Sequence, residues 1–303
     1  MHRRRARNAS ATACAISLMA GSAGAAETDA GANAVANANP QSPTTSACKG
    51  SRSCDRWLPS VGLGIGFNWQ QTSGDLDATP APGVSFAAFA NSEGSTLFKP
   101  TLTPDLMIES RALSESFGKP RAFLQLGATF PLGNESTVNN VLGDSGGVAE
   151  DPQLFLTIEW DAQWYTGVGV SFEVPIASRI VIVKPAFNYI GQSIEWVATA
   201  EQQIDTALGS PLVPFTTSEA QIHHGLAGSL QIETDLDSIG PVTPAVFIRG
   251  LVGAWIWGDR TALLPVDTFA SDGRASFVTT SQAELEALHF SLGVGIRLTW
   301  TGS

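Results

Sequence analysis

The sequence lacks the long apolar runs that a helical membrane protein needs. No stretch of about 18 consecutive apolar residues occurs in its 303 residues, which excludes membrane-spanning helices. Charge is also scarce, because only 15% of the residues are Asp, Glu, Lys or Arg. The formal net charge of −11 argues against nucleic acid as a partner, since nucleic-acid binding needs a basic surface. Such a chain can still hide its hydrophobicity in alternation, as the strands of a membrane β-barrel do.

Residues 1–26 predict a secretory signal peptide. A basic segment over 2–7 precedes a short apolar stretch over 11–20, and Ala23-Gly24-Ala25 is typical of a cleavage site. Cys14 would suit a lipoprotein signal, but no leucine lies three residues before it. The mature chain is therefore expected in an oxidising compartment beyond the inner membrane.

Residues 27–56 predict a disordered periplasmic leader. They are rich in Ala, Asn, Thr, Ser, Gly and Pro and show no periodicity. Cys48 and Cys54 lie in this leader, and in an oxidising space they predict a disulfide, with two free thiols as the alternative. A metal site would need two more ligands nearby, and none is visible. No cofactor motif is recognised, and none is expected.

Residues 57–303 predict an all-β fold, an antiparallel up-and-down transmembrane β-barrel. In the segment 287–300, apolar residues alternate strictly with polar or very small ones, so one strand face is apolar and the other is not. Seven earlier segments show the same alternation, which predicts eight strands. In chain order the segments are 60–69, 96–110, 121–131, 154–176, 179–200, 221–234, 245–258 and 287–300.

The connections between these segments alternate between long and short. Four of them have about 20 to 27 residues, and the three between them are shorter, down to the tight turn at Ala177-Ser178. Long extracellular loops and short periplasmic turns are typical of outer-membrane barrels. An even strand count then predicts that both termini lie in the periplasm.

The inward strand face is predicted to carry a network of opposite charges. An eight-stranded barrel is only wide enough for side chains to fill its lumen, so charges buried there must be paired. We therefore expect a closed, salt-bridged lumen rather than an ion pore. The predicted network consists of Lys99, Asp105, Glu109, Arg121, Glu173, Lys184, Glu233, Arg249 and Arg297.

The signal peptide, the eight strands, the loop asymmetry and the terminal segment G-V-G-I-R-L-T-W resemble the small outer-membrane β-barrel proteins of Gram-negative bacteria. This superfamily includes the OmpA transmembrane domain and the OmpX-like and OmpW-like barrels. The resemblance implies the cell outer membrane as location. It implies outer-membrane lipid, lipopolysaccharide and the barrel-assembly machinery as partners, with a surface protein or host ligand as a further candidate. In this sequence three residues follow Trp300, whereas family members usually end on the aromatic residue.

Three functions are compatible with this pattern. The favoured one is a structural or surface-interaction barrel that is not an enzyme, acting through its long loops. The second is an OmpW-like conduit for small apolar molecules. Phe123, Leu251 and Trp255 on the inward face give this function some support, because they are apolar. The third is a lipid-modifying enzyme, for which His289 and Ser291 share a strand face and form the one candidate catalytic pair.

The segment 154–176 predicts a hairpin that projects beyond the membrane together with its partner, 179–200. Each strand has about 22 residues, whereas a tilted span needs only about 9 to 11. Apolar residues keep one phase along 154–176. This predicts an exposed apolar surface ribbon with an adhesive or edge-pairing role, formed by Leu154, Leu156, Ile158 and Trp160.

Overall fold

The computed structural model describes residues 52, 55–80, 82, 88–115, 118–133, 135–142, 153–177, 179–203, 212–269 and 275–302. The predicted signal peptide, most of the predicted leader and the Cys48–Cys54 pair lie outside these residues. None of the described segments forms a helix that is long and apolar enough to span a membrane.

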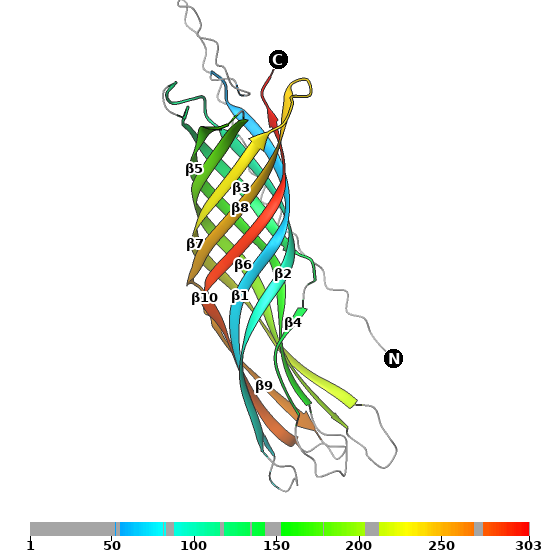
Figure 1. Ribbon diagram of the computed structural model, residues 1–303. Coiled ribbons are helices and arrows are strands. Elements are labelled where there is room, and N and C mark those ends of the chain that lie inside the picture. The colour runs from blue at the N-terminus through cyan, green and yellow to red at the C-terminus, as the bar shows by residue number, and fades with distance from the viewer. Residues whose placement is uncertain are drawn as a thin grey trace, which may run out of the picture. The chain divides into compact units, whose positions relative to one another are not determined.

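Eight long antiparallel strands form a closed ring, which confirms the predicted barrel (Figure 1). The order around the ring is β1-β2-β3-β5-β6-β7-β8-β10, and β10 pairs with β1 to close it. Two further strands, β4 and β9, pair with β5 and β10 outside the ring. The strands are β1 (Leu58–Pro80), β2 (Phe89–Glu109), β3 (Arg121–Pro131), β4 (Glu135–Leu142), β5 (Gln153–Ile176), β6 (Arg179–Gln203), β7 (Leu212–Asp235), β8 (Val242–Trp257), β9 (Thr261–Phe269) and β10 (Ala275–Trp300).

Most of the predicted long loops are strand instead. β1 continues to Pro80 and β10 begins at Ala275, so both run far beyond the predicted segments 60–69 and 287–300. β7 likewise begins at Leu212 rather than near residue 221. The three connections predicted to be short join β2 to β3, β5 to β6 and β7 to β8. They lie at the barrel end that also holds the start of β1 and the end of β10, here called the terminal end (Figure 1).

An apolar band surrounds the barrel on its outer face. Along each strand of the ring, the large side chains that are exposed in this part are apolar. On β1 they are Val61, Leu63, Ile65, Phe67 and Trp69, and on β10 they are Leu288, Leu292, Val294, Ile296, Leu298 and Trp300. An outward apolar surface of this kind is suited to lipid and not to water. The fold is therefore that of a transmembrane β-barrel.

Aromatic rings gather on the outer face away from the terminal end. Trp164 and Tyr189 lie 5.3 Å apart between ring centroids, and Tyr189 and Trp257 lie 6.4 Å apart. Trp69 packs on Phe290 at 4.8 Å. Rings of this type are typical of the boundary between the hydrocarbon and the headgroups of a membrane.

Beyond the band, the strands continue as what we call the extension. There β9, β10, β1 and β2 form one sheet, and β4, β5, β6 and β7 form another (Figure 1). Side chains of both sheets form one buried apolar cluster, among them Leu76, Leu285, Leu154, Leu156 and Trp196. The extension therefore has the interior of a soluble β-sandwich.

The predicted apolar surface ribbon is wrong, because its four side chains point inward. Leu154, Leu156 and Ile158 are fully buried, and Trp160 is 3% exposed. The cause is a β-bulge in β5, where the register with β6 shifts between Trp160 and Gln163. One extra residue moves all later side chains to the opposite face. Even-numbered residues therefore face outward on the side of the bulge toward the terminal end, as Trp164 does. They face inward on the side toward the extension, as Ile158 does.

The purified protein should behave as a heat-modifiable barrel in detergent. A closed ladder leaves no strand edge within the band, so the fold should resist detergent until it is heated. Boiled and unboiled samples should migrate differently on a gel, and far-ultraviolet circular dichroism should show sheet. A helical spectrum, or a protein that stays soluble after detergent removal, would contradict this fold.

Candidate functional site in the barrel lumen

A chain of ion pairs crosses the lumen near the terminal end. Lys184 on β6 lies 2.7 Å from Glu109 on β2 and 2.7 Å from Glu233 on β7. Arg297 on β10 lies 3.5 Å from Glu233 and 2.7 Å from Asp105. All five side chains are fully buried. Their opposite charges stabilise each other because four strands, β2, β6, β7 and β10, bring them together in the lumen.

Arg249 ends this chain of ion pairs. Its Nη1 donates to Asp105 at 3.1 Å and to the hydroxyl of Tyr165 at 2.5 Å. The Arg249 guanidinium also lies over the Tyr165 ring, 4.9 Å from the centroid. The ring of Phe247 lies between Arg249 and Arg297, within 6.0 Å and 5.5 Å of their guanidinium carbons. These contacts hold the charged groups in fixed positions across the lumen.

The other three members of the predicted network have different partners. Lys99 donates to the backbone carbonyls of Gly133 and Glu135, at 3.1 and 2.6 Å. Arg121 donates to the carbonyl of Ser110 at 3.0 Å. Glu173 lies 3.4 Å from Lys119 at the terminal rim. The structure thus joins six of the nine predicted residues by continuous ion pairs, from Glu109 through Asp105 to Arg249.

Arg52 belongs to the site although the sequence placed it in the leader. Its guanidinium binds Glu109 at 2.8 Å, Asp235 at 2.8 Å and Glu233, and the side chain is 1% exposed. Burial disfavours its charge, but Glu233 and Glu109 outweigh this and raise the pKa of Arg52 well above the ordinary value. Arg52 thus reaches the lumen from outside β1, which begins at Leu58. A lone arginine in an aperiodic segment gives no sequence signal for this contact.

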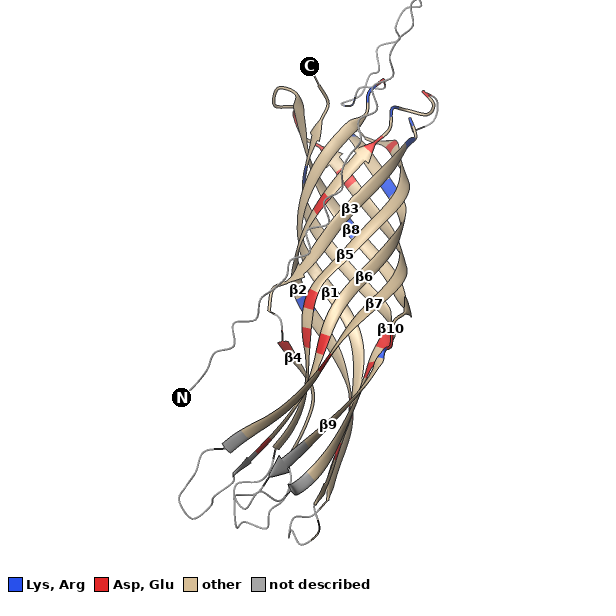
Figure 2. Cartoon of the chain, turned by 180° about the vertical axis from the view of Figure 1, so that it is seen from behind, with Lys and Arg blue, Asp and Glu red and all other residues tan. Residues whose placement is uncertain are grey.

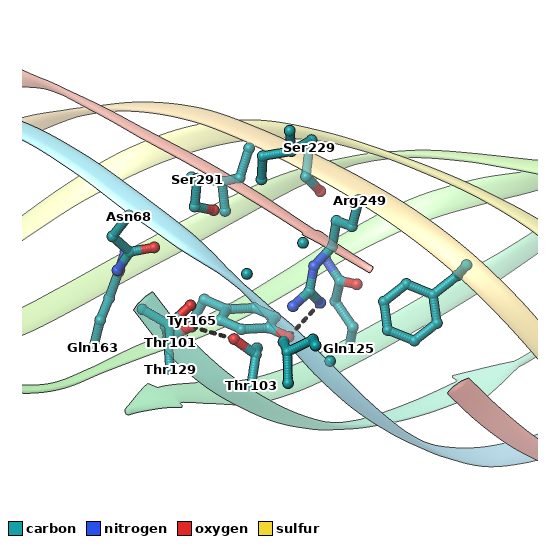
Figure 3. A pocket seen from close by; sticks show the side chains of 17 residues that line it. Asn68, Thr101, Thr103, Gln125, Thr129, Gln163, Tyr165, Ser229, Arg249 and Ser291 are labelled. Atoms are coloured by element: carbon teal, nitrogen blue, oxygen red, sulfur yellow. Dashed lines mark hydrogen bonds between the residues drawn. The ribbon is translucent and has the colours of Figure 1, made fainter. Parts of the chain in front are cut away.

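A small polar cavity lies in the middle of the lumen (Figure 3). Its volume is about 20 Å³, which is room for about one water molecule. Asn68, Gln163 and Arg249 are among the side chains that line it, and the Asn68 Oδ1 has no protein hydrogen-bond partner. A buried polar cavity of this size suits an ordered water and is too small for an organic ligand.

The amide side chains of Gln163 and Gln70 hold His289, the histidine of the candidate catalytic pair. The His289 Nε2 lies 3.1 Å from the Gln163 amide nitrogen, and its Nδ1 lies 3.3 Å from the Gln70 carbonyl oxygen. Trp255 donates to the same Gln70 oxygen at 3.1 Å. Because Gln163 must donate and Gln70 must accept, His289 is held neutral with its proton on Nδ1. The nitrogen atoms of His289 are thus occupied by amides and do not activate Ser291.

His223 and His224 are adjacent in the sequence and lie on opposite faces of β7, as the alternation of side chains along a strand predicts. His223 is fully buried in the lumen, and neither ring nitrogen has a hydrogen-bond partner. The His224 Nδ1 lies 3.0 Å from the Tyr189 hydroxyl in the outer aromatic group. No group of three or more metal-ligating side chains occurs among the residues that the structure describes.

No protein-family model matches the chain, and a search of curated proteins finds no match. Solved structures that resemble it include Neisserial surface protein A, at 11% identity over 76% of this chain and 95% of that chain, with a TM-score of 0.26. The major outer membrane protein of Thermus thermophilus matches at 11% identity, 76% and 99% coverage and a TM-score of 0.32. Ail of Yersinia pestis matches at 9% identity, 79% and 98% coverage and a TM-score of 0.26.

At these identities and TM-scores, the likenesses carry no argument about function. The fold rests instead on the geometry of this chain: a closed ring of eight antiparallel strands, apolar outside and charged inside.

Replacing Lys184 should destabilise the barrel far more than replacing a lysine at its rim. Lys184→Met leaves Glu109 and Glu233 buried beside each other, and breaking such a pair costs about 3–5 kcal/mol. Lys119→Met is the matched control, because Lys119 is 19% exposed and exposed pairs contribute about 0–1 kcal/mol. Urea unfolding in detergent micelles measures both variants. Equal losses of stability would show that the lumen network does not hold the barrel together.

Proposed function

We propose that this protein is a closed outer-membrane β-barrel that presents the extension at the cell surface as its interaction surface. The observation that carries the proposal is the reversal of apolar faces between band and extension. In the band, apolar side chains such as Ile65 and Leu292 face outward, whereas in the extension apolar side chains such as Leu156 and Trp196 face inward. The first arrangement suits lipid outside the barrel and the second suits water.

The placement in an outer membrane has two supports. Only closed barrels and helices can cross a bilayer, and the ring of this chain is closed at β1–β10. The predicted signal peptide would export the chain to the compartment from which such barrels are inserted. Membrane lipid and lipopolysaccharide are then the immediate neighbours of the band.

The proposed direction of insertion rests on the size of the two ends. The extension needs an aqueous space large enough for two sheets, which we assign to the cell exterior. The terminal end carries basic and acidic side chains together (Figure 2), among them exposed Arg56, Arg111, Asp55 and Asp237. Exposed Asp75 and Asp77 lie in the extension. This orientation places both termini in the periplasm.

The packed lumen favours this role over a conduit for apolar molecules. Phe123, Leu251 and Trp255 are the inward apolar residues that support a conduit. Each is at most 7% exposed, so their side chains are packed and do not line an open passage. In the extension, apolar side chains fill the space between the two sheets. The lumen cavity of about 20 Å³ is smaller than any apolar solute that a conduit would pass.

The broad outer sheet faces of the extension are the proposed contact surface. Two of its edge strands, β7 and β9, carry Pro214 and Pro265, and proline lacks the N–H that a pairing strand would bind. Edge pairing is therefore disfavoured along these strands. The faces are mainly polar and include the exposed side chains of Asp75, Asp77 and Thr280, although Leu263 and Val278 are exposed there too.

The closed lumen should not conduct ions. With Glu109, Lys184 and Glu233 paired across it, the purified protein should give no stable open level in a planar lipid bilayer. A porin of known conductance, inserted in the same bilayers, controls for the assay. Stable channels on the nanosiemens scale, which are typical of wide aqueous barrels, would overturn the closed-lumen proposal.

Labelling on intact cells tests the orientation. In a Cys48→Ser/Cys54→Ser background, Thr280→Cys should react with a membrane-impermeant thiol reagent, because Thr280 lies on the outer face of the extension. Ile239→Cys should react only after the outer membrane is permeabilised, since Ile239 is 75% exposed at the terminal end. Ile158→Cys, at a fully buried position, is the unreactive control. Labelling of Ile239→Cys alone on intact cells would mean that the barrel is inserted the other way round.

A further inference from the structure

Three carboxylates from two strands surround the guanidinium of Arg52 at the terminal mouth of the lumen. The Nη1 of Arg52 donates to the Glu109 Oε1 at 2.8 Å, and its Nη2 donates to the Glu233 Oε1. Its Nε and Nη2 both bind the Asp235 carboxylate, at 3.1 and 2.8 Å. All three nitrogens are thus engaged, and the pair of bonds to Asp235 matches the planar fork of a guanidinium.

The barrel holds two of these carboxylates in place without help from Arg52. The Glu109 Oε2 accepts from the Ser171 hydroxyl at 2.9 Å, and the Glu233 Oε2 accepts from the Gln231 amide at 2.7 Å. Lys184 draws the two Oε1 atoms together at 2.7 Å each. The oxygens that face the mouth are therefore positioned by the strands before a guanidinium arrives.

Arg52 reaches these carboxylates from a position before the first strand. It precedes β1 by six residues, and no backbone hydrogen bond of Arg52 occurs among the described contacts. The next described residues of this segment, Asp55, Arg56 and Trp57, are all exposed. Among the described residues that precede β1, Arg52 is the one whose side chain is buried in the mouth.

We propose that the terminal mouth of the lumen is a guanidinium-binding socket, formed by Glu109, Glu233 and Asp235, which Arg52 fills in this structure. The socket takes a free guanidinium cation from solution whenever Arg52 is absent or withdrawn. It prefers guanidinium to ammonium, because an ammonium offers no planar fork to Asp235. Arg52 is thus an exchangeable occupant of the socket, and its ion pairs join the residues before β1 to the barrel.

Chemical rescue of Arg52→Ala tests the socket. This variant lacks the side-chain atoms beyond Cβ, and ethylguanidinium supplies the same atoms as a free cation. Ethylguanidinium at millimolar concentration, well below denaturing levels, should raise the unfolding temperature of Arg52→Ala in detergent by about 3 °C or more. Ethylammonium at equal ionic strength should not, and wild type and the control Arg56→Ala should respond to neither compound.

Equal effects of ethylguanidinium and ethylammonium on Arg52→Ala, or no effect of either, would overturn the proposal. Arg52→Lys decides the matter should Arg52→Ala fail to fold even when ethylguanidinium is present during refolding. It keeps the positive charge but lacks the fork, so its unfolding temperature should lie several degrees below that of wild type. If Arg52→Lys were as stable as wild type, the socket would recognise positive charge alone and not the guanidinium group.

Discussion

The surface and the interior of this molecule exchange character along its length. In the band the outer face is apolar and the lumen is charged, whereas in the extension the outer face is mainly polar and the interior is apolar. A strand that passes through both regions has to change which of its faces is apolar. The two faces of a strand alternate with a period of two residues, so this change is possible only by altering the sequence pattern or by shifting the register.

The strands use both solutions. Along β1 the odd-numbered residues are apolar up to Trp69 and polar from Gln71 onward, while the even-numbered residues become apolar at Leu76. In β5 the even-numbered residues are apolar except for Thr166. The bulge near Gln163 places them in the interior of the extension and on the outer face of the band. The lumen is charged because the outer face of each strand contacts lipid and is apolar. The polar residues of the strand therefore lie on its inner face.

The sequence was sufficient for the ring and for most of the lumen network. Strict alternation in segments such as 287–300 identifies the strands and the inward face, and hence places Lys184 and Glu233 in the lumen. It was not sufficient for the extension, because small and polar residues such as those of 71–80 look like loop. The ribbon prediction failed at Ile158 because a bulge leaves no mark in an unbroken apolar period. Arg52 could not be found, since its role depends on carboxylates that are distant in the sequence.

The core of the extension gives this barrel an unusual thermodynamic character. Within the band, unfolding in detergent exchanges one apolar surrounding for another, so little apolar surface is newly hydrated. Leu76, Leu156 and Trp196 in the extension are instead shielded from water itself. Exposing such side chains to water increases the heat capacity. The extension is therefore the part of the molecule whose stability curves with temperature and weakens in the cold, as in a soluble domain.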